Sequence, residues 1–165
     1  MTHERIVIHD HDPAWAQCYA EESRLIAARI GALIHAIHHV GSTSVAGLAA
    51  KPIIDIAIES HAYPPGARNV AALSSLEYVH DGESGVPGRH FFRKGTPRRF
   101  HLHWCPVGGA VVQSQLAFKG ALIRRPDLAA RYADVKRSLA GRYTIDRADY
   151  VAAKEPIILE ILGSG

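Results

Sequence analysis

Residues 39–58 constrain the fold of this chain more than any other part of the sequence. The segment reads HVGSTSVAGLAAKPIIDIAI, in which a Gly-Ser turn and three consecutive hydroxyl residues precede an apolar run with one acid, Asp55. Short apolar runs beside glycine-containing turns are typical of strands. We therefore predict strands at residues 36–40 and 52–59, joined through a polar turn that leads to a carboxylate on the second strand.

The turn provides candidate ligands for a phosphate group. Glycine lets the backbone approach a bound group closely, and the amides and hydroxyls of such a turn can bind phosphate oxygens. An ordinary turn capped by its own serine and threonine side chains is the alternative. A lysine and a strand acid follow this turn and favour a binding site. The candidate ligands are Gly41, Ser42, Thr43, Ser44 and Lys51.

Asp55 is the candidate centre of that site. A carboxylate within the apolar sequence IIDIAI needs a cation or a metal as partner, because burying a lone charge is costly. A structural ion pair with an arginine or with Lys51 is the alternative. Glu59 shares the face of Asp55 but lies roughly 13 Å further along the strand, which is too far to share one ion.

A second polar group is predicted on the strand at residues 99–105. Phe100, Leu102 and Trp104 alternate there with His101, His103 and Cys105, so that the two histidines share one face. Two histidines opposite a carboxylate suit a metal, phosphate binding or proton transfer. A polar face turned to solvent is the alternative interpretation.

Composition limits the class of protein. A length of 165 residues fits one compact domain, and a hydrophobic content of 47% supports a packed core. No apolar run approaches the ~20 residues needed to cross a bilayer, and the N-terminus lacks the apolar block of a signal peptide. Two cysteines are too few for a disulfide framework or a zinc ribbon. A cytoplasmic protein without a membrane partner is expected.

The positive charge is local rather than global. A net charge of +3 is too small to argue for nucleic acid, so a nucleic-acid partner is not expected. Five basic residues nevertheless gather without an acid among them, which suggests either a solvated hairpin or a site for a phosphorylated ligand. They are Arg89, Arg93, Lys94, Arg98 and Arg99, of which Arg93 and Lys94 are candidate ligands.

The remaining pattern predicts an α+β fold with a helical C-terminal third. A helix should begin at Asp12-Pro13 and end at Gly31, and a hairpin should pair residues 89–94 with residues 99–105. Further helices are predicted at residues 67–76, 111–124, 127–141 and 146–162. Asp146 should cap the last of these, and Pro156 should interrupt it near Lys154, another candidate ligand.

The chain resembles the GrpB family over nearly its whole length. The resemblance rests on His39-Val40-Gly41-Ser42-Thr43-Ser44-Val45, on Gly47-Leu48-Ala49-Ala50-Lys51-Pro52 before Ile53-Ile54-Asp55-Ile56, and on His101-Leu102-His103. It also rests on Asp12-Pro13 with Trp15, Pro87-Gly88-Arg89, Phe92-Arg93-Lys94-Gly95, Leu116-Ala117-Phe118, the Tyr132-to-Lys136 segment and Tyr150 with Lys154. It implies one domain over residues 1–165, with the small mixed sheet and flanking helices of the nucleotidyltransferase superfamily related to DNA polymerase beta. Some members look like domains joined to dephospho-CoA kinase.

One departure from the superfamily pattern affects the reaction that the resemblance implies. Gly-Ser and Asp55 match, but the second carboxylate expected two residues later is Ala57. Nucleotidyl transfer normally uses several carboxylates to hold two divalent ions. If the neighbouring strand offers His101 and His103 instead, zinc, manganese or iron suits the set better than magnesium.

The leading functional hypothesis is a cleft for a nucleotide or another phosphorylated small molecule, with nucleotidyl or related group transfer as the first candidate reaction. Asp55, His101 and His103 are its candidate catalytic residues, with or without a divalent metal that the three would bind. One alternative is a non-catalytic module that stabilises a protein partner such as a coenzyme A enzyme. A single-metal enzyme that uses the same three residues is the other.

Overall fold

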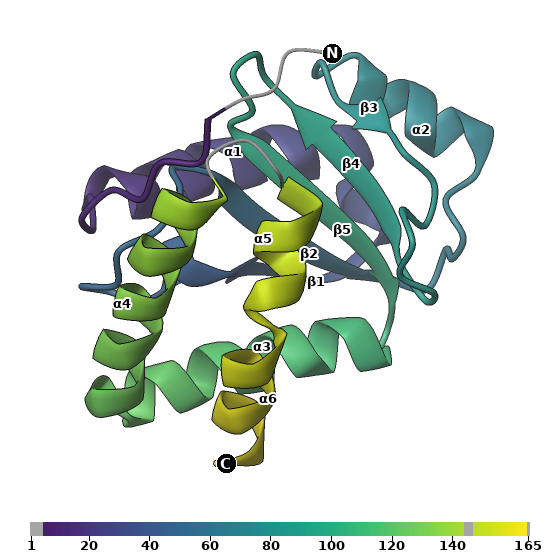
Figure 1. The fold of residues 1–165 in the computed structure, drawn as a ribbon. Coiled ribbons are helices and arrows are strands. Elements are labelled where there is room, and N and C mark those ends of the chain that lie inside the picture. Colours follow the sequence, from purple (N-terminus) through teal and green to yellow (C-terminus); the bar gives the residue numbers. More distant parts are fainter. Residues whose placement is uncertain (1–4, 144–146, 165) are drawn as a thin grey trace.

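The computed structural model describes residues 5–143 and 147–164, and it has the predicted α+β architecture (Figure 1). Its mixed sheet has the strand order β1-β2-β5-β4-β3. The strands are β1 (Ile34–Val40), β2 (Ile54–Ser60), β3 (Val79–His80), β4 (His90–Lys94) and β5 (Phe100–Pro106). Only β2 and β5 run parallel among the paired strands described, so the mixed sheet that the sequence predicted is confirmed.

One face of the sheet is apolar and is covered by α1 (Ala14–Ile30) and α2 (Ala67–Ser74). The alternation of β5 directs Phe100, Leu102 and Trp104 into this core, as predicted, and Trp104 has no exposed surface. Helix α1 begins one residue later than expected, but Asp12 still accepts a hydrogen bond from the Ala14 amide at 2.9 Å. This face therefore supplies most of the apolar burial that stabilises the sheet.

Four helices lie on the other side of the sheet (Figure 1). They are α3 (Ala110–Arg124), α4 (Pro126–Arg142), α5 (Arg147–Ala153) and α6 (Glu155–Gly163). The predicted interruption near Pro156 is confirmed, because α5 ends and α6 begins on either side of Lys154. The predicted cap at Asp146 lies outside the described residues. None of the described helices is both long and apolar enough to span a bilayer.

Candidate functional site

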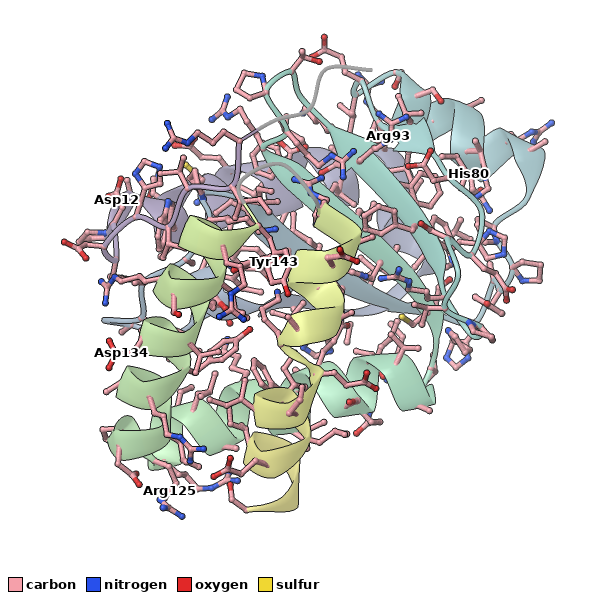
Figure 2. The ribbon with its side chains drawn as sticks, viewed as in Figure 1. Asp12, His80, Arg93, Arg125, Asp134 and Tyr143 are labelled. Atoms are coloured by element: carbon pink, nitrogen blue, oxygen red, sulfur yellow. The ribbon has the colours of Figure 1, made fainter. Side chains whose placement is uncertain are left out.

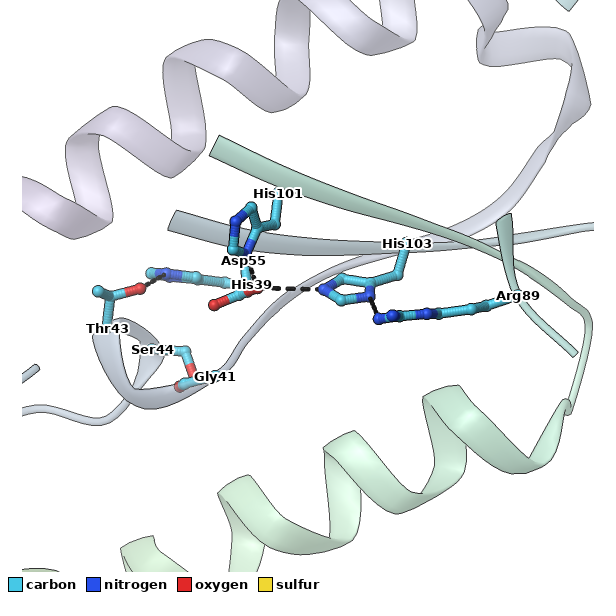
Figure 3. A network of polar contacts seen from close by, with 8 residues as sticks. All are labelled: His39, Gly41, Thr43, Ser44, Asp55, Arg89, His101 and His103. Carbon is cyan, nitrogen blue, oxygen red and sulfur yellow. Dashed lines mark hydrogen bonds and ion pairs between the residues drawn. The ribbon is translucent and has the colours of Figure 1, made fainter. Parts of the chain in front are cut away.

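The parallel pairing of β2 with β5 brings the predicted polar residues together. Asp55 lies directly beside His101 in the strand register, and Ala57 lies beside His103. A single carboxylate oxygen, Asp55 Oδ1, is 3.1 Å from His101 Nδ1 and 3.1 Å from His103 Nε2 (Figure 3). His103, the cross-strand neighbour of Ala57, therefore contacts Asp55 from beside the position where a second carboxylate was expected.

Arg89 determines which nitrogen of His103 carries the proton. Its Nη1 atom lies 2.8 Å from His103 Nδ1, and a guanidinium group can only donate. His103 Nδ1 must accept this bond, so Nε2 carries the proton and donates it to Asp55. Burial lowers the pKa of His103, which agrees with a neutral ring. The order of contacts is thus Arg89 to His103 to Asp55.

Asp55 is ionised in this arrangement. Burial alone would raise the pKa of its carboxyl group, but the hydrogen bonds from His101 and His103 outweigh burial and hold that pKa well below its usual range. In the tautomer in which His101 donates to Asp55 through Nδ1, its Nε2 atom keeps a lone pair. That atom is buried and makes no hydrogen bond to any described residue. An imidazole oriented by a carboxylate and left open at Nε2 can accept a proton.

The Gly-Ser turn packs directly against the carboxylate. Gly41 has a φ of +72°, and a Cβ atom at this position would lie 2.7 Å from Asp55 Oδ2. The three hydroxyls of the turn already have partners within the protein. Ser42 bonds to Tyr132, Thr43 Oγ1 lies 3.0 Å from His39 Nε2, and Ser44 Oγ donates to the Gly41 carbonyl at 2.6 Å. The glycine is needed here for contact with Asp55, and the hydroxyls hold the turn in shape.

Three lysines gather on the α4–α6 side of the turn, over two tyrosine rings. Lys51 and Lys154 lie 5.0 and 4.6 Å from the centre of the Tyr150 ring, and Lys136 lies 4.4 Å from that of Tyr132. Lys136 is only 3% exposed and donates a short hydrogen bond to the Ala49 carbonyl. The cluster is therefore built from the segment before β2, from α4, and from the junction between α5 and α6.

Among the residues that the structure describes, cations outnumber acids around the lysine cluster. Burial, followed by the neighbouring cations, lowers the pKa of Lys51 to about 8 and that of Lys136 to about 7. Burial also lowers the pKa of Lys154. Asp55 is the acid that opposes these shifts for Lys51 and Lys154. Repulsion between like charges in a dry site is relieved by a bound anion.

Two further buried polar atoms around this site make no hydrogen bond to a described residue. They are the hydroxyl of Tyr150, whose side chain has no exposed surface, and the Nε of Arg89. Both groups can donate, and buried donors normally have a partner. A ligand with several acceptor oxygens would provide one.

Comparison with known proteins identifies the family to which this arrangement belongs. The family model described as "GrpB protein" matches residues 5–164. The chain belongs to the GrpB family. The structure is also similar to the crystal structure of the conserved protein GrpB from Enterococcus faecalis, with a TM-score of 0.86 and 29% identity over 96% of this chain and 98% of that one. The resemblance on which the sequence prediction rested is confirmed at the level of the family.

Curated GrpB relatives extend beyond the matched region. UPF0157 protein PA4798 of Pseudomonas aeruginosa is 40% identical over 97% of this chain and 67% of its own length. UPF0157 protein YqkA of Bacillus subtilis is 34% identical over 88% of this chain, which spans only 43% of YqkA. A protein named dephospho-CoA kinase from Mycolicibacterium paratuberculosis is 34% identical, again over 88% of this chain and 42% of its own length.

The two candidate ligands from the basic hairpin, Arg93 and Lys94, each pair with an acid, although Arg93 is the cross-strand neighbour of His101. Lys94 projects to the opposite face of the sheet, where it pairs with Glu22 of α1 at 2.8 Å. Arg93, labelled in Figure 2, lies on the β3 side of the sheet and pairs with Asp81 at 2.6 Å. Gly41, Lys51 and Lys154 do lie around Asp55, whereas Arg93 and Lys94 each form an ion pair with an acid elsewhere.

Sequence reasoning missed three residues of the site. Arg89 was noticed only as part of a basic run, and Lys136 and the Tyr150 hydroxyl were not proposed as ligands. A signal for the lysines exists in the spacing, because Tyr132 precedes Lys136 by four residues and Tyr150 precedes Lys154 by four. Residues four apart are neighbours on a helix surface, which allows each lysine to lie over its tyrosine ring.

The histidine and carboxylate set does not fit a metal in this arrangement. Among the residues that the structure describes, no group of three or more His, Cys, Asp or Glu side chains is placed to hold an ion. His103 directs a proton, not a lone pair, at Asp55 while Arg89 occupies its other nitrogen. Coordination by His103 would require Arg89 to move, so metal binding by these three residues stays a prediction.

Proposed function

We propose that this GrpB chain binds a nucleotide or another phosphorylated small molecule at the lysine cluster beside Asp55. The observation that carries the proposal is the clustering of Lys51, Lys136 and Lys154 over two tyrosine rings, with Lys136 buried and the other two half-buried. A buried cation without an anionic partner is costly, and several together are more so. The protein keeps them close to one another, which is expected if a ligand supplies the missing negative charge.

A phosphate-bearing ligand matches the site better than a single carboxylate. Phosphate oxygens accept several charge-assisted hydrogen bonds at once, and each lysine offers up to three donors. The Tyr150 hydroxyl adds a donor from beneath Lys51 and Lys154. A diphosphate or triphosphate would satisfy several of these groups together.

The proposed chemistry is nucleotidyl or related group transfer. In nucleotidyl transfer the attacking hydroxyl oxygen would bond to the α-phosphorus of a nucleoside triphosphate, while the bond to the β-phosphate breaks and pyrophosphate leaves. His101 would accept the hydroxyl proton at Nε2, while Asp55 holds the ring through Nδ1. Arg89 and His103 would keep Asp55 ionised and oriented. Magnesium is usually bound by substrate phosphates with one or two carboxylates, and Asp55 is the carboxylate available for this.

Calorimetric titration tests the proposed binding. The probes are ATP, CTP, tripolyphosphate and dephospho-coenzyme A, each with and without magnesium. We expect at least one polyphosphate probe to bind, and Lys154→Met to weaken it at least about tenfold. Arg68→Met, which removes an exposed charge on α2, serves as the control and should not change affinity. The absence of binding by every probe would refute the proposal.

A second candidate function is a module that acts with a coenzyme A enzyme. The similarity to the protein named dephospho-CoA kinase, in which the matched region is 42% of the length, supports it. The test is sedimentation of this chain with a purified dephospho-CoA kinase from the same organism. A defined complex, combined with no binding of any small-molecule probe, would favour the module over the enzyme.

The single-metal hypothesis has a separate test. Elemental analysis of the purified protein measures zinc, manganese and iron per chain, in the unaltered protein and in His101→Ala. A stoichiometric metal that disappears in His101→Ala would support metal binding by Asp55 and the two histidines. It would also require Arg89 to leave His103 Nδ1 in the metal-bound state.

A further inference from the structure

A cavity of about 280 Å³ opens next to Lys51, outside the Asp55 site. Its wall comes from the N-terminal segment, the residues just before β2, the β4–β5 turn and the first residue of α5. These segments are far apart in sequence and converge at one end of the sheet, as Figure 1 shows. Lys51 is the one described lining residue that the sequence pattern predicts as a ligand.

The wall of the cavity is apolar and its charges are all of one sign. Val7, Pro52, Ile53 and Pro97 line it, together with four basic residues. Those four are Arg5, Lys51, Arg98 and Arg147, and none of the described lining residues is acidic. A surface of this kind suits a ligand that has a flat or aliphatic body and negative charge at one end.

Lys51 belongs both to the wall of the cavity and to the lysine cluster. The same side chain lines the cavity and lies over the Tyr150 ring that Lys154 also covers. Ligand pockets commonly enclose about 300–1,000 Å³, so this cavity suits one ring system rather than a whole nucleotide. If the phosphates of a ligand bind the lysine cluster, the rest of the ligand must lie either in this cavity or in solvent.

We propose that this cavity receives the base, or another ring of similar size, of the ligand whose phosphates bind the lysine cluster. The inference rests on the proposed function and adds the substrate class, a phosphorylated compound with a compact ring. Pro52, Pro97 and Ile53 would contact the ring, and Lys51 would contact the phosphate closest to it. The ligand would thus extend from Asp55 towards the N-terminal segment.

Comparing ATP with tripolyphosphate isolates the contribution of the ring. Calorimetric titration of the unaltered protein should show ATP binding at least about tenfold tighter than tripolyphosphate. Val7→Trp fills the cavity without changing charge, and Val7 is 45% exposed, so folding should be retained. We expect this variant to lose the advantage of ATP while tripolyphosphate affinity stays within about twofold.

Matched variants keep the experiment decisive. Val151→Trp makes the same change at a residue of α5 that is 53% exposed and does not line the cavity, and it should alter neither affinity. His9→Trp fills the same cavity from a second position, in case Val7→Trp does not fold. Thermal melting of each variant establishes that it is folded before titration.

The outcomes separate this inference from the proposed function. If tripolyphosphate binds and ATP binds no better, or if both cavity variants bind ATP as the unaltered protein does, the ring lies elsewhere and only the inference fails. An equal loss of ATP and tripolyphosphate in the cavity variants would also overturn it, because the ring would not be what the cavity recognises. If neither probe binds, the proposed function fails and the inference fails with it.

Discussion

Each face of the sheet has a lysine with little exposed surface, but the two lysines have different partners. On the α1 side, Lys94 forms an ion pair with Glu22 at 2.8 Å. On the α4 side, Lys136 donates only to a backbone carbonyl, and its neighbours are other cations. The charge of Lys94 is balanced by Glu22 within the protein, so no external anion is required there. On the α4 side a bound anion would offset the repulsion among these cations, which is why the proposed ligand is assigned to that face.

The largest expected effect comes from breaking the pair on the apolar face. Glu22→Met should lower the free energy of unfolding by about 3–5 kcal/mol, because it leaves the Lys94 side chain, which is only 16% exposed, without its partner. Urea denaturation provides the measurement. The double variant Glu22→Met/Lys94→Met should recover most of the loss. If it does not, the pair is not the reason for the cost.

Gly41 tests the contact between the turn and the carboxylate on the polar face. Gly41→Ala should cost about 3 kcal/mol of stability, because it combines a positive φ with a Cβ 2.7 Å from Asp55 Oδ2. Gly47→Ala is the matched control, since its φ is +80° but no atom lies within 4 Å of the added Cβ. It should cost only about 1 kcal/mol. Equal losses in urea denaturation would show that the close approach to Asp55 is unimportant.

Lys136→Met should affect ligand binding on the α4 side of the sheet while changing the stability of the protein very little. At pH 7 it should change the free energy of unfolding by less than about 1 kcal/mol, because removing one like charge offsets the lost bond to the Ala49 carbonyl. Affinity for tripolyphosphate should fall at least about tenfold, measured by calorimetric titration. An unchanged affinity for tripolyphosphate would show that Lys136 does not contribute to binding.

The last prediction concerns the dependence of stability on pH. Lys136 has a folded-state pKa of about 7, below the unfolded value near 10.5, so between these values the unfolded chain binds more protons. Stability without ligand should therefore rise as pH increases from about 7 to 9, and Lys51 adds to the rise above about 8. Urea midpoints across this range measure it. Lys136→Met should flatten the curve, and a curve that falls with pH would contradict the assignment.

The strands and most helices could be predicted from local pattern. The alternation of Phe100, Leu102 and Trp104 correctly indicated one buried face, and Pro156 correctly indicated a break in the last helical segment. Glycine at position 41 suggested a close approach, but the group approached is Asp55 of the same chain. The local sequence indicated that another group approaches Gly41 closely, but it did not identify that group as Asp55.

The candidate site was predicted only in part, because its charges come from distant segments. Lys51 and Lys154 lie about one hundred residues apart in sequence, yet both cover the Tyr150 ring. Lys94 was predicted as a ligand from its basic neighbours and instead pairs with Glu22, 72 residues away. Local composition indicates where cations occur, but it does not reveal which of them have acids nearby in space.

The sequence alone determined the elements, the family and the residues at the centre of the site, because periodicity, turns and motifs are local properties. Tertiary structure decided how those residues are used. The parallel register of β2 and β5 joins Asp55 to both histidines, and Arg89 assigns the proton of His103. The packing of α4, α5 and α6 brings three lysines together, and Asp55 is the described acid that favours the charged form of two of them. Protonation and charge balance depend on neighbours in space, which no single segment of the chain specifies.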